Sequence, residues 1–129
     1  MEKVTGIGGM FFRAKDSKTL ARWYLDHLGI ALVPTDYDAL PWMQEAGPTA
    51  FAPFAESTEY FGDRSKVWMI NFRVPNLDAM VAQLRAAQIS VEVDSHIYPN
   101  GRFARAHDPE GNPIELWEPA APNTTHQPA

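Results

Sequence analysis

The sequence has no cysteine, little positive charge and no long hydrophobic run. The absence of cysteine excludes disulfides, thiol nucleophiles and thiolate metal sites. Its 11 lysines and arginines against 16 acidic residues give a net charge of −5, which offers no electrostatic basis for binding nucleic acid or an anionic membrane. No run approaches the roughly 18 apolar residues of a membrane span. The first residues also lack the basic and apolar regions of a signal peptide, so we expect a cytoplasmic location.

What the sequence does contain is typical of a globular domain. Of its 129 residues, 45% are hydrophobic and 21% are charged, so the chain is long enough to bury a core. Residues 120–129 are small, polar and proline-bearing, a composition that predicts a flexible tail. We therefore expect a single domain over residues 1–119.

A weak pattern repeats at about half the length of the chain. When residues 7–16 are placed over residues 67–76, Phe12 falls on Phe72 and Arg13 falls on Arg73. Each copy is a strand-like run that stops at Asp or Asn, a residue type that favours a helix N-cap. The repeat predicts two similar units.

Each copy is followed by a helical pattern and then by short β-type segments. The apolar positions that recur at helical spacing are Leu20, Trp23, Tyr24 and Leu28 in the first unit, and Leu77, Met80, Val81 and Leu84 in the second. The β-type segments are residues 30–33, 42–45 and 49–54, then 91–93, 102–107 and 113–118. We predict two βαβββ units, at about 4–56 and 67–119, joined by a linker at 57–66. The alternative is a generic α+β domain with an accidental repeat.

The last predicted strand follows a turn, residues 108–112, whose proline, glycine and asparagine are typical turn formers. In the strand, Ile114 and Leu116 share one face, whereas Glu115 and Trp117 share the other. A carboxylate beside a tryptophan on the inner face of a sheet is costly unless a charge is needed there. This pattern makes Glu115 a candidate catalytic or binding residue.

Three segments carry a resemblance to a known family: GIGGMFFRAKD at the start, WYLDHLGI in the first helix and DPEGNPIELWEP at the close. Together they resemble the glyoxalase/bleomycin-resistance/extradiol-dioxygenase superfamily, also called vicinal oxygen chelate proteins. The resemblance implies an α+β fold in which the two units form a curled eight-stranded mixed sheet, with helices outside and a ligand cup inside. It also implies a homodimer.

Alternation along the strands then assigns the cup lining. The predicted lining residues are Phe11, Arg13, Asn71, Arg73, Phe103, Arg105, Glu115 and Trp117. The assignment depends on a hairpin register in which Arg105 opposes Glu115 and Phe103 opposes Trp117. An aromatic and cationic lining suits a flat or apolar ligand with an anionic group. Arg13 and Arg73 could instead lie on a solvated sheet edge.

The resemblance also implies four metal-ligand positions, and this chain departs from them. They fall on Gly9, on residues 50–52, on Met69 and on Glu115, of which only Glu115 is a suitable ligand. One carboxylate cannot hold Zn²⁺, Ni²⁺ or Fe²⁺, which need three or four protein ligands. We therefore predict a cup without a metal or other cofactor. A shifted divalent site built from His96, His107 and Glu115 is the alternative.

Three functions follow from these features. The first is a binding protein for a small anionic or aromatic molecule, with Glu115 paired to Arg105. The second is an enzyme of lyase, isomerase or dioxygenase type, with Glu115 as general base or as ligand of an atypical metal site. The third is a non-catalytic partner-binding module that uses the aromatic residues Trp42, Tyr60 and Phe61.

Overall fold

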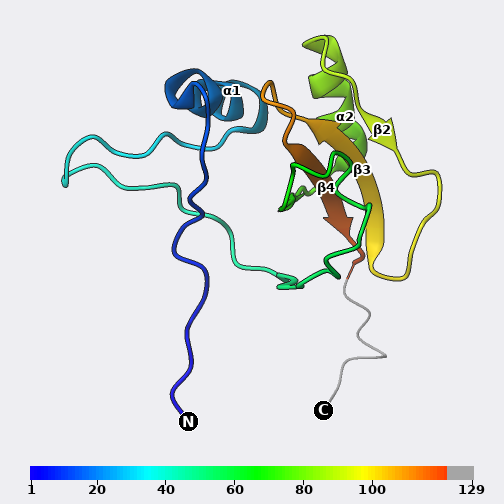
Figure 1. Cartoon of the computed structure of the whole chain (residues 1–129), viewed down its shortest axis with the longest axis horizontal. Helices are drawn as coiled ribbons and strands as arrows, with labels where there is room; N and C mark the ends of the chain where they lie inside the picture. Colours follow the sequence, from blue (N-terminus) through cyan, green and yellow to red (C-terminus); the bar gives the residue numbers. More distant parts are fainter. Residues whose placement is uncertain (122–129) are drawn as a thin grey trace.

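The computed structural model describes residues 1–121, and residues 122–129 of the predicted tail lie outside the described part. Two helices and four strands follow one another along the chain (Figure 1). They are α1 (Ser17–Leu28), β1 (Ile70–Arg73), α2 (Leu77–Ala86), β2 (Glu92–Val93), β3 (Gly101–His107) and β4 (Pro113–Pro119). The prediction of an α+β fold is confirmed.

The sheet is mixed and has the order β1-β4-β3-β2. β1 runs parallel to β4, whereas β2 with β3 and β3 with β4 are antiparallel. All four strands and α2 come from residues 70–119, so they form one βαβββ unit at the place predicted for the second unit.

Both helices begin directly after the Asp or Asn residue predicted as the N-cap. The Asp16 carboxylate accepts a hydrogen bond from the Thr19 amide at 3.2 Å, and the Asn76 side chain accepts one from the Ala79 amide at 2.9 Å. Gly29 ends α1 in the left-handed conformation, with φ of 72°, which glycine adopts without steric cost.

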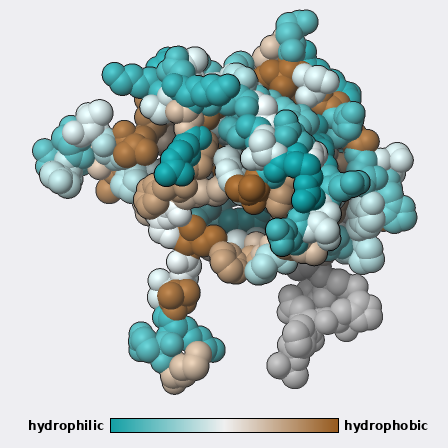
Figure 2. Space-filling model, viewed as in Figure 1, coloured by the Kyte–Doolittle hydropathy of each residue, from teal (hydrophilic) through white to brown (hydrophobic). Residues whose placement is uncertain are grey.

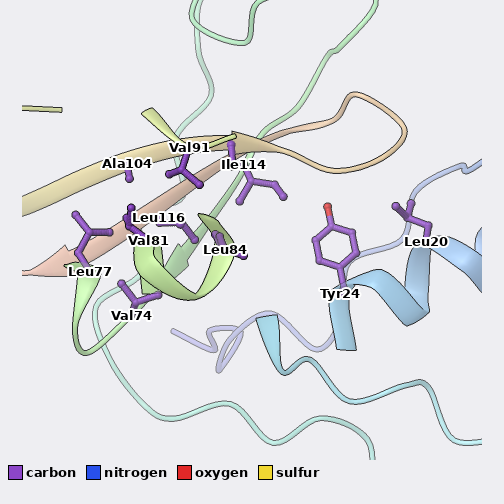
Figure 3. Close-up of a cluster of buried hydrophobic side chains, with 11 residues drawn as sticks. Leu20, Tyr24, Val74, Leu77, Val81, Leu84, Val91, Ala104, Ile114 and Leu116 are labelled. Atoms are coloured by element: carbon purple, nitrogen blue, oxygen red, sulfur yellow. The ribbon is translucent and has the colours of Figure 1, made fainter. Parts of the chain in front are cut away.

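The core lies between α2 and one face of the sheet. Leu77 and Leu84 of α2 are almost fully buried, and so are Ile114 and Leu116 of β4. Figure 3 shows these side chains packed together, with Tyr24 and Leu20 of α1 on one side of the cluster. Burial of this apolar surface is the main force that stabilises the unit.

The predicted eight-stranded sheet is not formed, because residues 1–69 contain no strand. The segments 30–33, 42–45 and 49–54 run as extended loop beside the sheet (Figure 1). Val33 exposes 86% of its surface and Phe51 exposes 85%. A strand forms only where a neighbour supplies partners for its backbone N–H and C=O groups. These segments find no such neighbour, although their side chains favour strands.

The predicted linker is a series of turns that crosses the front of the sheet (Figure 1). Backbone hydrogen bonds close it at three points: Thr58 to Ala55 at 2.9 Å, Gly62 to Glu59 at 3.0 Å and Lys66 to Asp63 at 2.9 Å. Within residues 1–121, no helix is long and apolar enough to cross a membrane.

Candidate functional site

The sheet face opposite the core carries two rows of side chains that run across the strands. The register pairs Glu92 with Arg105, Arg105 with Glu115, and Glu115 with Asn71, which gives a polar row over all four strands. The adjacent row, called the aromatic row, pairs Phe103 with Trp117 and ends at Arg73. The predicted pairings of Arg105 with Glu115 and of Phe103 with Trp117 are confirmed.

Glu115 is the centre of the polar row. Its Oε1 atom accepts a hydrogen bond from the Asn71 amide at 2.7 Å, and its Oε2 atom accepts one from the Tyr60 hydroxyl. Both oxygens of the carboxylate are therefore engaged by neutral donors. This arrangement holds the carboxylate in one orientation on the sheet.

The expected ion pair between Arg105 and Glu115 is not formed. Ion pairs in residues 1–121 join Arg22 to Asp26 and Arg102 to Asp78, and neither involves this face. Arg105 instead contacts Tyr60, whose backbone oxygen accepts a hydrogen bond from the guanidinium. The guanidinium carbon also lies 4.9 Å from the centre of the Tyr60 ring, within the range of a cation–π contact. Tyr60 thus contacts both Arg105 and Glu115, and these two residues do not pair directly.

Tyr60 remains neutral at physiological pH. Partial burial, and then the hydrogen bond to the Glu115 carboxylate, raise the pKa of Tyr60 to about 12. Burial disfavours the phenolate because it removes the charge from water, and the carboxylate disfavours it because a second negative charge would lie beside the first. Tyr60 is therefore a hydrogen-bond donor in this site.

The aromatic row is ordered by stacking. The rings of Phe103 and Trp117 are nearly parallel, with an interplanar angle of 4° and centres 6.2 Å apart. The Trp117 indole donates a 2.8 Å hydrogen bond to the Asn100 carbonyl, and Tyr98 meets Phe103 edge-on at 5.7 Å. Such contacts fix the ring planes and leave a flat apolar surface for a planar ligand.

Loops from the first half cover part of this face. Arg73, at the end of the aromatic row, donates a 3.0 Å hydrogen bond to the Glu45 carbonyl. At the opposite side of the polar row, Ser90, Glu92, Arg105 and His107 line a small hollow of about 180 Å³. Figure 2 shows a further depression between the first half of the chain and the sheet, with hydrophobic residues on its rim. The face is therefore partly enclosed.

Two predicted lining residues are not brought to this face. Phe11 and Arg13 lie in the N-terminal segment, which forms no strand, and Phe11 exposes 96% of its surface. Conversely, sequence reasoning assigned Tyr60 to a partner surface and missed its contact with Glu115. The only signal for it was an aromatic pair, Tyr60 and Phe61, within an otherwise polar linker.

The side chains of this face do not fit the metal site that the resemblance implies. Glu115 is the one suitable ligand among the four positions, and both of its oxygens already accept hydrogen bonds. Nowhere in residues 1–121 do three or more His, Asp or Glu side chains gather as a metal site requires, so His96 and His107 do not complete a site with Glu115.

Comparison with known proteins gives one family and several similar folds. The sequence model of the glyoxalase-like domain family matches residues 9–117. No curated protein matches the chain.

Two solved structures have a similar fold. The crystal structure of TnmS3, an antibiotic binding protein from Streptomyces sp. CB03234, is similar with a TM-score of 0.63 and 17% identity, over 93% of this chain and 100% of that one. A glyoxylase/bleomycin resistance protein/dioxygenase domain from Frankia sp. EAN1pec gives a TM-score of 0.59 and 19% identity, over 92% and 100%. At these identities the two structures indicate a shared fold.

Proposed function

The chain belongs to the glyoxalase-like domain family of the vicinal oxygen chelate superfamily, and from this premise we propose that it binds a small aromatic molecule without a metal. The observation that carries the proposal is the stacked pair of Phe103 and Trp117, which lies between the arginines of the same sheet face. A planar ligand placed on these rings would bury apolar surface and gain a stacking contact.

The charges near the aromatic row support a ligand of this kind. Arg73 follows Trp117 in the row, and Arg105 is the neighbour of Phe103 two positions along β3. A guanidinium can lie over an aromatic face or donate to an oxygen at the edge of a ligand. The description of TnmS3 as an antibiotic binding protein is further support for small-molecule binding by this fold.

In this proposal Glu115 is a binding residue rather than a catalytic base. A general base needs a free lone pair directed at the proton that it removes. Each carboxylate oxygen already accepts one hydrogen bond, from Asn71 or from Tyr60, and these contacts hold the group in place. Each oxygen keeps a second lone pair, so lyase or isomerase chemistry would need a substrate that approaches the carboxylate beside these two donors.

Calorimetric titration with 2-naphthoate, a planar aromatic carboxylate, tests the proposal. We expect saturable binding to the wild-type protein and an affinity at least roughly tenfold lower for Trp117→Ala, equivalent to about 1.4 kcal/mol. Tyr37→Ala is the matched control, since Tyr37 is fully exposed and lies off the sheet. Circular dichroism checks that both variants fold. Equal binding by wild type and Trp117→Ala would reject this sheet face as the ligand site.

We also propose a homodimer in which the first half of one copy meets another copy. Large apolar side chains of this half, including Phe11, Val33 and Phe51, are almost fully exposed in the single chain. Exposed apolar surface of this extent favours association, and strand-forming segments without partners could pair in the dimer. Light scattering should give twice the 14.4 kDa of the chain, and Phe51→Asp should lower this mass. A monomeric wild-type protein would refute the proposal.

A further inference from the structure

Tyr60 is the one member of the Glu115 network that does not belong to the sheet. It comes from the linker, 55 residues before Glu115, and lies on the face proposed above for the ligand. We propose that Tyr60 occupies a phenol-binding subsite, and that the ligand is a neutral hydroxylated aromatic molecule whose hydroxyl replaces that of Tyr60. This inference rests on the proposed function and specifies the aromatic ligand as a hydrogen-bond donor.

The polar end of the subsite selects a donor. An ionised carboxylate such as Glu115 only accepts hydrogen bonds, and Asn71 fixes its second oxygen at 2.7 Å. A ligand hydroxyl at this position gains a charge-assisted hydrogen bond. A ligand carboxylate would place a second negative charge beside Glu115 and would be repelled.

The cationic side of the subsite selects an aromatic ring rather than an anion. The Arg105 guanidinium lies over the face of the Tyr60 ring, with 4.9 Å between its carbon and the ring centre. The electron-rich face of a ring attracts a cation, so Arg105 contributes to binding of a ligand without formal charge. The pair of Arg105 and Glu115 therefore matches one chemical group, a phenol, at both its face and its hydroxyl.

The linker holds Tyr60 in a way that permits exchange. On the linker side its ring stacks on Phe54 at 5.7 Å with an interplanar angle of 27°, and Phe54 meets Phe61 at 5.1 Å. Tyr60 and Phe54 still expose 44% and 48% of their surfaces, and neither belongs to the buried core. A segment with few buried contacts opens at a small cost in free energy. Release of Tyr60 should therefore leave the sheet folded.

If Tyr60 fills the subsite, it competes with the ligand. The apparent affinity of the wild-type protein for a phenol then equals the intrinsic affinity multiplied by the fraction of molecules in which Tyr60 has left the subsite. Removal of the Tyr60 side chain should therefore raise the affinity for a phenol. It should leave the affinity for an anionic aromatic probe unchanged, because such a probe does not use the subsite.

The test compares 2-naphthol with 2-naphthoate in calorimetric titrations at neutral pH, using wild type, Tyr60→Ala and the control Tyr37→Ala. We expect Tyr60→Ala to bind 2-naphthol roughly tenfold more tightly than wild type and 2-naphthoate with little change. Adding Glu115→Gln to Tyr60→Ala should remove most of the gain, since the acceptor loses its charge. Circular dichroism verifies that each variant retains its helices and strands.

Three results would overturn the inference. If 2-naphthol binds wild type and Tyr60→Ala equally while 2-naphthoate binds both, Tyr60 does not occupy the ligand position, and the proposed function stands alone. If both probes gain equally in Tyr60→Ala, the subsite does not select a donor. If neither probe binds any variant, the proposed function fails together with the inference.

Discussion

The hydroxyl of Tyr24 in α1 donates a 2.6 Å hydrogen bond to the carboxylate of Asp108, in the turn between β3 and β4. Asp108 exposes only 4% of its surface and also accepts from the Asn112 side chain at 2.7 Å. Glu110, in the same turn, accepts from the backbone amides of Lys15 at 2.7 Å and Asp16 at 3.1 Å. The turn therefore anchors the first helix to the sheet, although the rest of the first half forms no strand.

Tyr24→Phe should destabilise the protein without changing its fold. The substitution keeps the ring in the core but removes one donor from a buried carboxylate, which typically costs about 1–3 kcal/mol. Urea denaturation should show this loss in the free energy of unfolding. Tyr37→Phe should leave the free energy unchanged, because the Tyr37 side chain is exposed. Equal stability of wild type and Tyr24→Phe would mean that the bond adds nothing to anchoring of α1.

The stability of the protein should fall at alkaline pH, partly because of the same tyrosine. Burial, and then the hydrogen bond to Asp108, raise the pKa of Tyr24 above its ordinary value. In the unfolded chain tyrosine titrates near pH ~10, so above this pH the unfolded state releases a proton that the folded state retains. The contribution of Tyr24 to the free energy of unfolding is therefore complete below pH ~10. Above this pH it falls by about 1.4 kcal/mol per pH unit.

Unfolding experiments between neutral pH and the alkaline range check this linkage. Tyr60, with its pKa raised to about 12, contributes in the same direction up to that pH. Because phenylalanine does not ionise, Tyr24→Phe should lose stability less steeply with pH than wild type. Parallel slopes for the two proteins would show that Tyr24 titrates normally in the folded state.

The core prediction concerns Leu116, whose side chain is fully buried between the sheet and α2. Leu116→Ala leaves a cavity and should lower the free energy of unfolding by about 2–5 kcal/mol. Ile97→Ala is the control outside the core, in the loop between β2 and β3, where the side chain is 70% exposed and the expected change is within about 0.5 kcal/mol. A similar loss from both substitutions would show that burial of Leu116 is not what stabilises the unit.

The second half of the chain was predictable because its signals are local. Asn76 and the apolar spacing define α2, and the turn at residues 108–112 sets the register of β3 and β4. Once that register is fixed, alternation decides which side chains share the face with Glu115. The N-cap Asp16 and the apolar spacing defined α1 in the same way.

The first half and the centre of the site were not predictable, because they depend on contacts between distant segments. Strand propensity in residues 30–54 does not reveal whether a neighbouring strand is present. The register that places Arg105 opposite Glu115 was predicted correctly, but the expected ion pair between them is not formed, because the path of the linker brings Tyr60 to both residues. No pattern near Glu115 in the sequence indicates this competitor.

Divalent metals should not stabilise the protein. Any ion that binds the folded state raises the melting temperature, but Glu115, which accepts hydrogen bonds from Asn71 and Tyr60, does not belong to a group of three or more suitable ligands among residues 1–121. We therefore expect Zn²⁺, Ni²⁺, Mn²⁺ and Fe²⁺ to leave the melting temperature of the untagged, chelator-treated protein unchanged. Glu115→Gln is the control that separates site binding from weak surface binding. A metal-dependent increase in wild type that Glu115→Gln abolishes would show that the carboxylate exchanges its neutral donors for an ion, and it would restore metal chemistry to this sheet face.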